Sequence, residues 1–214
     1  MTNERESWWR ERRMGGRALL TLAFLLPAAL AAGCGQPPAE AEMTATGDAI
    51  ARGRYLVTVG GCNDCHTPWV LGEDGHPAPD RSRMLSGHPQ NLEMPPAPAA
   101  AGPWIWSGAA TNTAFAGPWG VSFATNLTPD ENTGIGVWDE EIFVDAMRTG
   151  RHWGQSRPIL PPMPWQNLAA MTDEDLAAMF AYLRSIPPIE NRVPEPLPPA
   201  AGGAEAGMVG SPSP

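Results

Sequence analysis

The sequence contains no lysine, so its 14 basic residues are all arginine. With 23 acidic residues, the formal net charge is −9, which disfavours nucleic acid as a partner. Three cysteines in 214 residues are too few for a disulfide-stabilised scaffold. The hydrophobic run at 18–33 has 16 residues, short of the roughly 20 that a membrane-spanning helix needs. These absences point away from nucleic-acid binders, disulfide scaffolds and ordinary transmembrane proteins.

Glycine and proline are abundant by contrast. The 23 Gly and 25 Pro make up about 22% of the chain, against roughly 12% in an average protein. A charged fraction of 17% and a hydrophobic fraction of 43% argue against disorder throughout. The composition therefore predicts short helices in a loop-rich body. It excludes a coiled coil, a long helical bundle and a multi-strand barrel.

Residues 1–33 are typical of a lipoprotein signal peptide. Five arginines precede the uncharged stretch 18–33, which ends in small residues before Cys34. Residues 30–34 resemble a bacterial lipobox, which implies cleavage before Cys34 and a lipid anchor on its sulfur. Ordinary soluble export and an uncleaved anchor are the alternatives. Each alternative places the domain outside the cytoplasm, and we expect a lipid-anchored protein on the periplasmic side of a bacterial membrane.

Removing this segment changes the charge of the remaining chain. The segment holds five Arg and three Glu, so the rest carries 9 basic and 20 acidic residues, a net charge of −11. We interpret residues 34–46 as a lipidated flexible tether. The Pro-, Gly- and Ala-rich tail at 188–214 is expected to be disordered. Residues 47–187 then form one domain of ordinary size.

Three segments of this domain have the apolar periodicity and end signals of helices. They are 47–61, 139–149 and 172–186, with Asp139 and Thr172 as N-caps of the second and third. Between 67 and 138 turn-forming residues and tryptophan dominate, and no stretch predicts a strand. We therefore expect an all-α domain, with three main short helices wrapped by long loops.

One short motif carries chemistry. Residues 62–66 read Cys-Asn-Asp-Cys-His, the C-x-x-C-H pattern of covalent haem c attachment. Two residues between the cysteines place both sulfurs on one side of a helical turn, within reach of the two haem vinyl groups. The adjacent His66 is then placed to ligate the iron. We expect one haem c, bound covalently through Cys62 and Cys65.

Two other interpretations of the cysteine pair find less support. A thioredoxin-like redox pair needs a βαβ context, which the sequence does not show. A structural zinc site needs four ligands, but there is no second C-x-x-C and the other histidines lack paired spacing.

Met163 is the favoured candidate for the second axial ligand of the haem iron. It lies in Pro161-Pro162-Met163-Pro164, where the prolines stiffen an extended loop that can hold a sulfur against iron. A Met ligand raises the reduction potential and suits electron transfer, whereas an open position suits gas binding or catalysis. The other candidates are Met84, Met94, His88, His152 and an open site.

The order of these features resembles a class I cytochrome c. A helix leads into 62–66, a Met-bearing loop follows downstream, and a helix closes the domain. In that fold the first and last helices cross through a small residue, and Gly53 and Tyr182 fit those positions. The resemblance implies a class I cytochrome c fold around one covalent haem.

A closer resemblance covers 119–187. The segments Trp119–Asp130, Thr133–Gly136, Pro162–Pro164 and Asp173–Arg184 are similar to the cytochrome c domains that serve membrane-associated bacterial alcohol and aldehyde dehydrogenases. In those domains the Met of P-x-M-P is the distal ligand, which here is Met163. This chain differs from them in its single haem motif and in a long insertion at 70–118. The single motif favours a shuttle or tethered relay.

These features together predict an electron carrier and no catalytic residue. Acidic charge predicts redox protein partners with a basic docking surface, and Cys34 predicts attachment to a membrane. A haem sensor or haem enzyme with a labile distal ligand is the alternative, and a purely structural lipoprotein is a third. Trp138, Arg148 and Arg151 are candidate contacts of the haem propionates, or else packing and helix-end residues. Trp104 and Trp106 could form a docking patch or pack within the loops.

Overall fold

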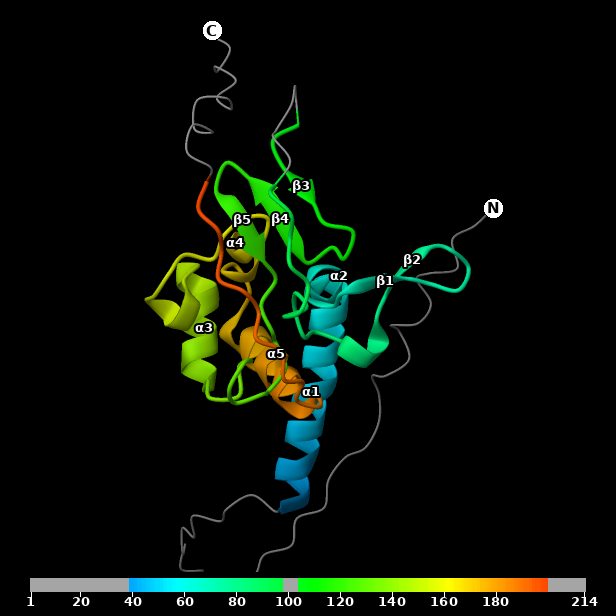
Figure 1. The fold of residues 1–214 in the computed structure, drawn as a ribbon. Coiled ribbons are helices and arrows are strands. Elements are labelled where there is room, and N and C mark those ends of the chain that lie inside the picture. The colour runs from blue at the N-terminus through cyan, green and yellow to red at the C-terminus, as the bar shows by residue number, and fades with distance from the viewer. Residues whose placement is uncertain (1–38, 98–103, 200–214) are drawn as a thin grey trace, which may run out of the picture. The chain divides into compact units, whose positions relative to one another are not determined.

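The computed structural model describes residues 39–97 and 104–199, and side chains from residue 46 onward. The predicted signal peptide, Cys34 and residues 200–214 lie outside the described residues. Short strands and helices are distributed along the chain as follows: α1 Ala39–Val59, α2 Cys62–His66, β1 Trp69–Leu71, β2 Pro77–Pro79, η1 Arg81–Arg83, β3 Ser107–Gly108, β4 Ala114–Gly117, β5 Gly120–Phe123, α3 Glu140–Thr149, η2 His152–Gly154, α4 Trp165–Leu168 and α5 Asp173–Ser185 (Figure 1).

The three predicted helices are confirmed as α1, α3 and α5. The Asp139 side chain accepts a hydrogen bond from the Ile142 N–H and so caps α3, which ends at Gly150 with φ of 64°. Thr172 caps α5 by accepting from the Asp175 N–H. Helix α1 begins at Ala39, so residues 39–46 are helical rather than the flexible tether that the sequence suggested.

The described domain is predominantly helical, but the expectation of an all-α domain is wrong for 67–138. Strands β1 and β2 form one antiparallel pair, and β3, β4 and β5 form a second antiparallel sheet in that order. Each strand has only two to four residues. Strands of that length are too short to show the two-residue alternation from which a strand is predicted.

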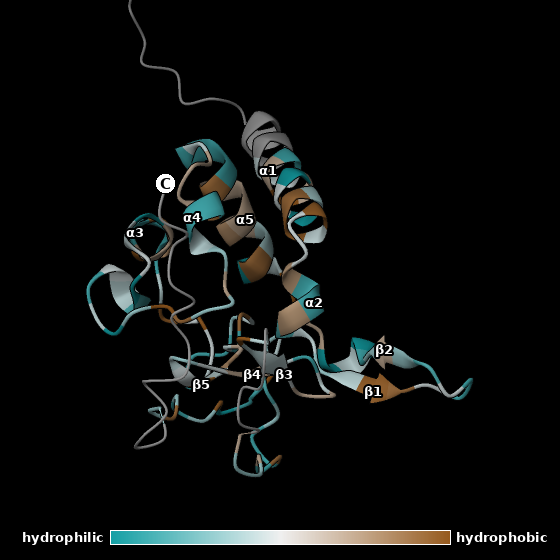
Figure 2. Ribbon diagram, turned by 90° about the horizontal axis from the view of Figure 1, so that it is seen from above, coloured by the Kyte–Doolittle hydropathy of each residue, from teal (hydrophilic) through white to brown (hydrophobic). Residues whose placement is uncertain are grey.

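Helices α1 and α5 lie side by side (Figure 2). Gly53 of α1 lies at their contact, as the resemblance to class I cytochrome c implied. A Cβ atom at Gly53 would lie 1.8 Å from the Ala178 carbonyl oxygen and 2.9 Å from Tyr182 Cβ. Val57 and Leu183 are buried beside this crossing and join a core that includes Phe143 and Phe180. The absence of a side chain at Gly53 therefore sets how closely the two helices approach.

A Gly53→Ala variant is expected to lose about 3 kcal/mol or more of its free energy of unfolding, since the added methyl group meets backbone that cannot move aside. Gly47→Ala is the matched control on the same helix, because nothing lies within 4 Å of its Cβ position. Higher helix propensity should make that variant more stable by up to about 1 kcal/mol. Urea unfolding measures both variants. Equal effects at the two positions would contradict the crossing.

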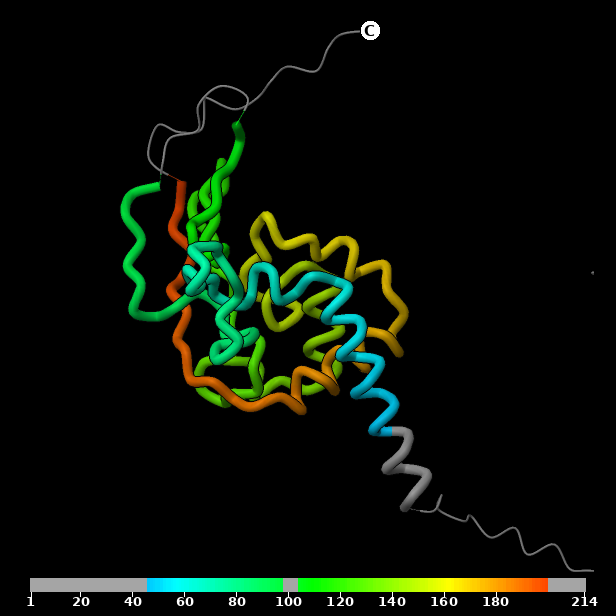
Figure 3. The backbone as a smooth tube through the Cα atoms, turned by 90° about the vertical axis from the view of Figure 1, so that its right-hand side faces the viewer, coloured from blue at the N-terminus to red at the C-terminus, as the bar shows by residue number. Residues whose placement is uncertain are grey.

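Residues 187–199 form a strap that runs from the end of α5 back to the β3–β5 sheet (Figure 3). The prediction that disorder begins at 188 is wrong for this part of the tail. Leu197 exchanges both backbone hydrogen bonds with Val121, at 2.9 Å each, and Asn191 is fully buried. Proline-rich composition suggested disorder, but the strap is fixed by polar contacts that composition does not show.

Candidate functional site

The two cysteines of the motif lie on α2, directly after α1. Gly61, with φ of 67°, separates the two helices and lets α2 begin at Cys62. Cys62 and Cys65 are three residues apart in this helix, so their side chains lie on the same face. Both are unpaired and partly exposed. The structure therefore presents two thiols on one helical turn, as covalent attachment of a haem requires.

Burial raises the pKa of the Cys62 thiol to about 11 and also raises the pKa of Cys65. Redox-active C-x-x-C pairs have a lowered thiol pKa, because their chemistry needs the thiolate. The raised values therefore argue against the thioredoxin-like alternative. Within 39–97 and 104–199 no group of three or more His, Cys, Asp or Glu side chains is arranged to hold a metal ion.

His66 is buried at the end of α2, where its ring has one fixed partner. Its Nδ1 lies 2.7 Å from the Thr125 carbonyl oxygen, which can only accept, so Nδ1 carries the proton. Nε2 then keeps its lone pair, and no residue in the described part of the chain hydrogen-bonds to it. Burial lowers the pKa of His66. A neutral, oriented imidazole with an unprotonated Nε2 is the form that ligates iron.

Met163 lies partly buried in the loop before α4. The Ser122 hydroxyl donates to the Pro161 carbonyl over 2.6 Å and ties this loop to β5. Thr125, the partner of His66, follows three residues later on the same segment, a span of at most about 10 Å. One short segment thus contacts both the loop of Met163 and the ring of His66.

His88 and His152, the two histidines considered as alternatives to Met163 for the second axial position, differ in what their rings contact. His88 is fully buried, with Nδ1 2.9 Å from Thr113 Oγ1 and Nε2 3.2 Å from the Leu92 carbonyl, so neither nitrogen is free for iron. The His152 ring has no hydrogen bond within the described residues. Burial lowers the pKa of His152 to about 4, aided by the positive charge of Arg157. His152 is therefore neutral at pH 7 and is the stronger competitor of Met163.

The candidate propionate contacts mostly have protein partners. Arg148 donates to the Ala169 carbonyl and the Asp173 carboxylate, and Arg151 donates to the Ser156 carbonyl. Trp138 packs against the core and on Trp153, with ring centroids 5.3 Å apart. Both arginines therefore contact loops and helix ends, and Trp138 packs in the core, as in the packing alternative that the sequence offered.

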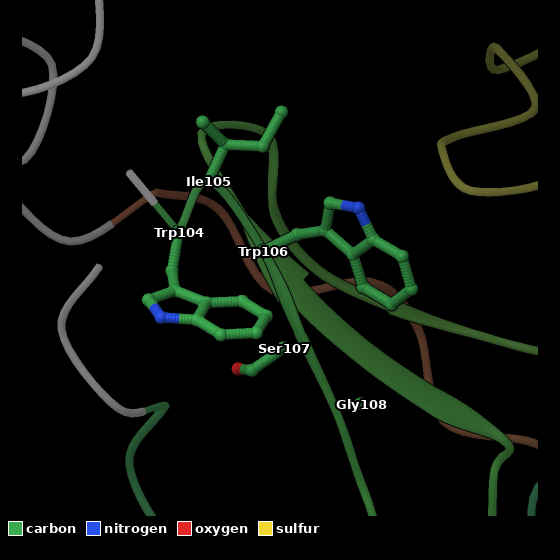
Figure 4. Close-up of a pocket in the computed structure, with 5 residues that line it drawn as sticks. All are labelled: Trp104, Ile105, Trp106, Ser107 and Gly108. Atoms are coloured by element: carbon green, nitrogen blue, oxygen red, sulfur yellow. The ribbon is translucent and has the colours of Figure 1, made fainter. Parts of the chain in front are cut away.

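Trp104, Ile105 and Trp106 lie directly before β3 and remain exposed, at 75%, 54% and 45%. With Ser107 and Gly108 they line an open cavity of about 390 Å³. Figure 4 shows the two indole rings spread to either side of the chain, with Ile105 directed away from both. Trp106 also meets Phe115 edge-on, at 6.0 Å between centroids. Packing within the loops thus explains part of the position of the Trp106 side chain, but it does not explain the position of Trp104.

Sequence reasoning missed the acceptor for His66. It is the backbone carbonyl of Thr125, and no side-chain pattern marks such a group. Sequence reasoning also missed that Asn191 is fully buried, because it lies in the segment that was expected to be disordered. In the described part of the chain, no helix has both the length and the apolar character needed to cross a membrane.

The residues present fit a covalent haem: two unpaired thiols on one helical turn and a buried, oriented histidine directly after them. Comparison with known proteins agrees. The family model for cytochrome c matches residues 50–187. The chain is also similar to one of the subunits of nicotinate dehydrogenase from Pseudomonas putida, with 30% identity over 90% of this chain and 13% of that protein.

Two further relatives are named as cytochrome subunits. The fructose dehydrogenase cytochrome subunit of Gluconobacter japonicus is 27% identical over 75% of this chain and 26% of its own length. The cytochrome c subunit of alcohol dehydrogenase (quinone) from Gluconobacter oxydans is 29% identical over 68% of this chain and 24% of its own length. The chain therefore spans about a quarter or less of each relative. Its match over 50–187 places it among electron-transfer components rather than catalytic enzymes, and the chain belongs to the cytochrome c family.

Proposed function

We propose that this chain is a mono-haem c-type cytochrome that carries single electrons between extracytoplasmic redox partners. The observation that carries the proposal is the hydrogen bond from His66 Nδ1 to the Thr125 carbonyl, directly after two unpaired thiols on one helical turn. It orients the histidine as a ligand in a chain with a single C-x-x-C-H motif. Cys62 and Cys65 would form the thioethers, and His66 would ligate the iron.

Haem c supplies a one-electron couple between ferrous and ferric iron. The chain's own residues determine where that couple lies. Met163 is proposed as the distal ligand, because its loop is held to β5 through Ser122 and because a thioether favours the reduced state. No described side chain needs to act as an acid, base or nucleophile in this role.

The partners are proposed to be redox proteins with a basic docking surface. Glu140, Glu141 and Glu174 are exposed at the first turns of α3 and α5, whereas Asp173 and Asp175 are each paired with an arginine. Such docking should weaken as salt is added. By analogy with relatives named as cytochrome subunits, a membrane-associated dehydrogenase is a candidate donor. Cys34 is proposed as the lipid anchor that keeps the protein at the membrane.

The function is tested on the purified full chain by redox titration and carbon monoxide binding. We expect reversible one-electron reduction, a near-red charge-transfer band of iron–thioether ligation in the oxidised protein, and no rapid carbon monoxide binding by the reduced protein. Rapid binding without loss of fold would instead favour a haem sensor or haem enzyme with a labile distal ligand. A chain with no haem would support a purely structural lipoprotein.

A further inference from the structure

The strap at 187–199 carries one fully buried polar side chain, Asn191. Its Nδ2 donates to the Ser86 carbonyl over 2.7 Å and to the His88 carbonyl over 2.8 Å. Its Oδ1 accepts from Arg83 Nη2 over 2.8 Å and from the Gln90 N–H over 3.0 Å. An amide has two donor hydrogens and two acceptor lone pairs, so all four are used. All four partners lie in residues 83–90.

Residues 83–90 contact the chain at His66 directly. The Gly87 N–H donates to the His66 carbonyl over 2.8 Å, and the Leu85 N–H donates to Thr67 Oγ1 over 2.9 Å. Gly87 has φ of 79°, and a Cβ there would lie 2.4 Å from the Ala124 carbonyl oxygen. Close contact on both sides of Gly87 therefore fixes this segment between His66 and residue 124.

Residues 83–90 also bond to the segment 124–127, which contains the acceptor of the His66 ring. The His88 N–H donates to the Ala124 carbonyl over 2.9 Å, and the Leu127 N–H donates to the Leu85 carbonyl over 2.8 Å. Thr125 lies between these two attachment points, and its carbonyl accepts from His66 Nδ1. The position of that carbonyl therefore depends on residues 83–90, and these depend on Asn191.

We propose that Asn191 is a positioning residue for the haem ligand His66. This inference rests on the proposed function, in which His66 Nε2 ligates the iron. By fixing 83–90, Asn191 holds the Thr125 carbonyl where it accepts the Nδ1 proton. That hydrogen bond makes the imidazole a more basic ligand, which favours ferric iron and lowers the reduction potential. The strap thus helps to set the potential as well as to stabilise the domain.

Asn191→Leu tests the proposal in the haem-loaded full chain, because the leucine side chain has the same number and branching of heavy atoms, adds no charge and forms no hydrogen bonds. We expect a higher reduction potential, so that the ratio of reduced to oxidised protein at a fixed applied potential rises on the order of threefold. We also expect faster solvent exchange of the His66 Nδ1 proton in the NMR spectrum of the reduced protein. If the leucine variant does not fold, the same measurements are made on Asn191→Ser, which is the milder variant.

Gln90→Ala is the matched control. It removes one side-chain contact between the strap and residues 83–90, the acceptor of the Arg192 N–H at 2.8 Å, and keeps the backbone N–H of residue 90 and with it all four hydrogen bonds of the Asn191 amide. Its potential and proton exchange should match the wild type. A folded Asn191 variant with unchanged potential and exchange would overturn the proposal and leave the strap a purely structural role. If the wild type itself shows no axial-histidine proton, the proposed function fails instead, before any variant is compared.

Discussion

Replacing Cys62 and Cys65 together with serine is expected to yield a chain that carries no covalently bound haem. A serine hydroxyl cannot form the thioether that each sulfur would make, and each single variant should keep one thioether and retain haem at a lower yield. Both thiols are unpaired and lie on the same turn of α2. Haem staining of the denatured chain after gel electrophoresis measures the effect.

Cys34→Ser is the matched control for this experiment, because it removes the one other cysteine of the chain. Its covalent haem should be fully retained. If Cys34 carries the lipid anchor, the wild type should incorporate a labelled fatty acid and the Cys34→Ser variant should not. Covalent haem that persists in the double variant would contradict the assigned attachment site, and a Cys34 variant that still incorporates the fatty acid would contradict the anchor.

Met163→Ala is expected to remove the distal ligand and with it the charge-transfer band of the oxidised protein. The reduced variant should bind carbon monoxide rapidly. Its reduction potential should fall by on the order of 100 mV or more, since axial ligands set haem potentials over a range of roughly 0.8 V. Spectroelectrochemistry of the full chain measures both the band and the potential.

Met84→Ala is the matched control, because Met84 is also partly buried and packs against the core. It should cost stability while leaving the band and the potential unchanged. An unchanged spectrum in Met163→Ala would refute the choice of Met163. A new low-spin spectrum that disappears in the Met163→Ala, His152→Gln double variant would show that neutral His152 takes the vacated position.

The sequence predicted those parts of the fold that local patterns encode. Asp139 and Thr172 were identified as caps, because capping chemistry acts over three or four positions. The crossing at Gly53 and Tyr182 was expected from the resemblance to class I cytochrome c. The haem attachment motif at 62–66 could also be predicted from the sequence, since its chemistry depends on the spacing of residues within one helical turn.

The rest could not be predicted, because it depends on contacts between distant residues. The Thr125 carbonyl is a backbone group 59 positions from His66, and any residue type would supply it. Asn191 lies among prolines, and its partners at 86 and 88 are more than 100 positions away in the sequence. The strands at 107–123 depend on pairing among two to four residues each. Local sequence patterns and residue propensities do not indicate which distant segments pair.

The most direct test of the account is the stoichiometry of covalent haem in the exported wild-type chain. Alkaline pyridine converts a thioether-bound haem to a spectrum distinct from that of free haem, and protein concentration is measured on the same sample. The account predicts one haem per chain, retained after extraction with acidified acetone. No haem, an extractable haem, or two haems per chain would each contradict the assignment of a single covalent site at Cys62 and Cys65.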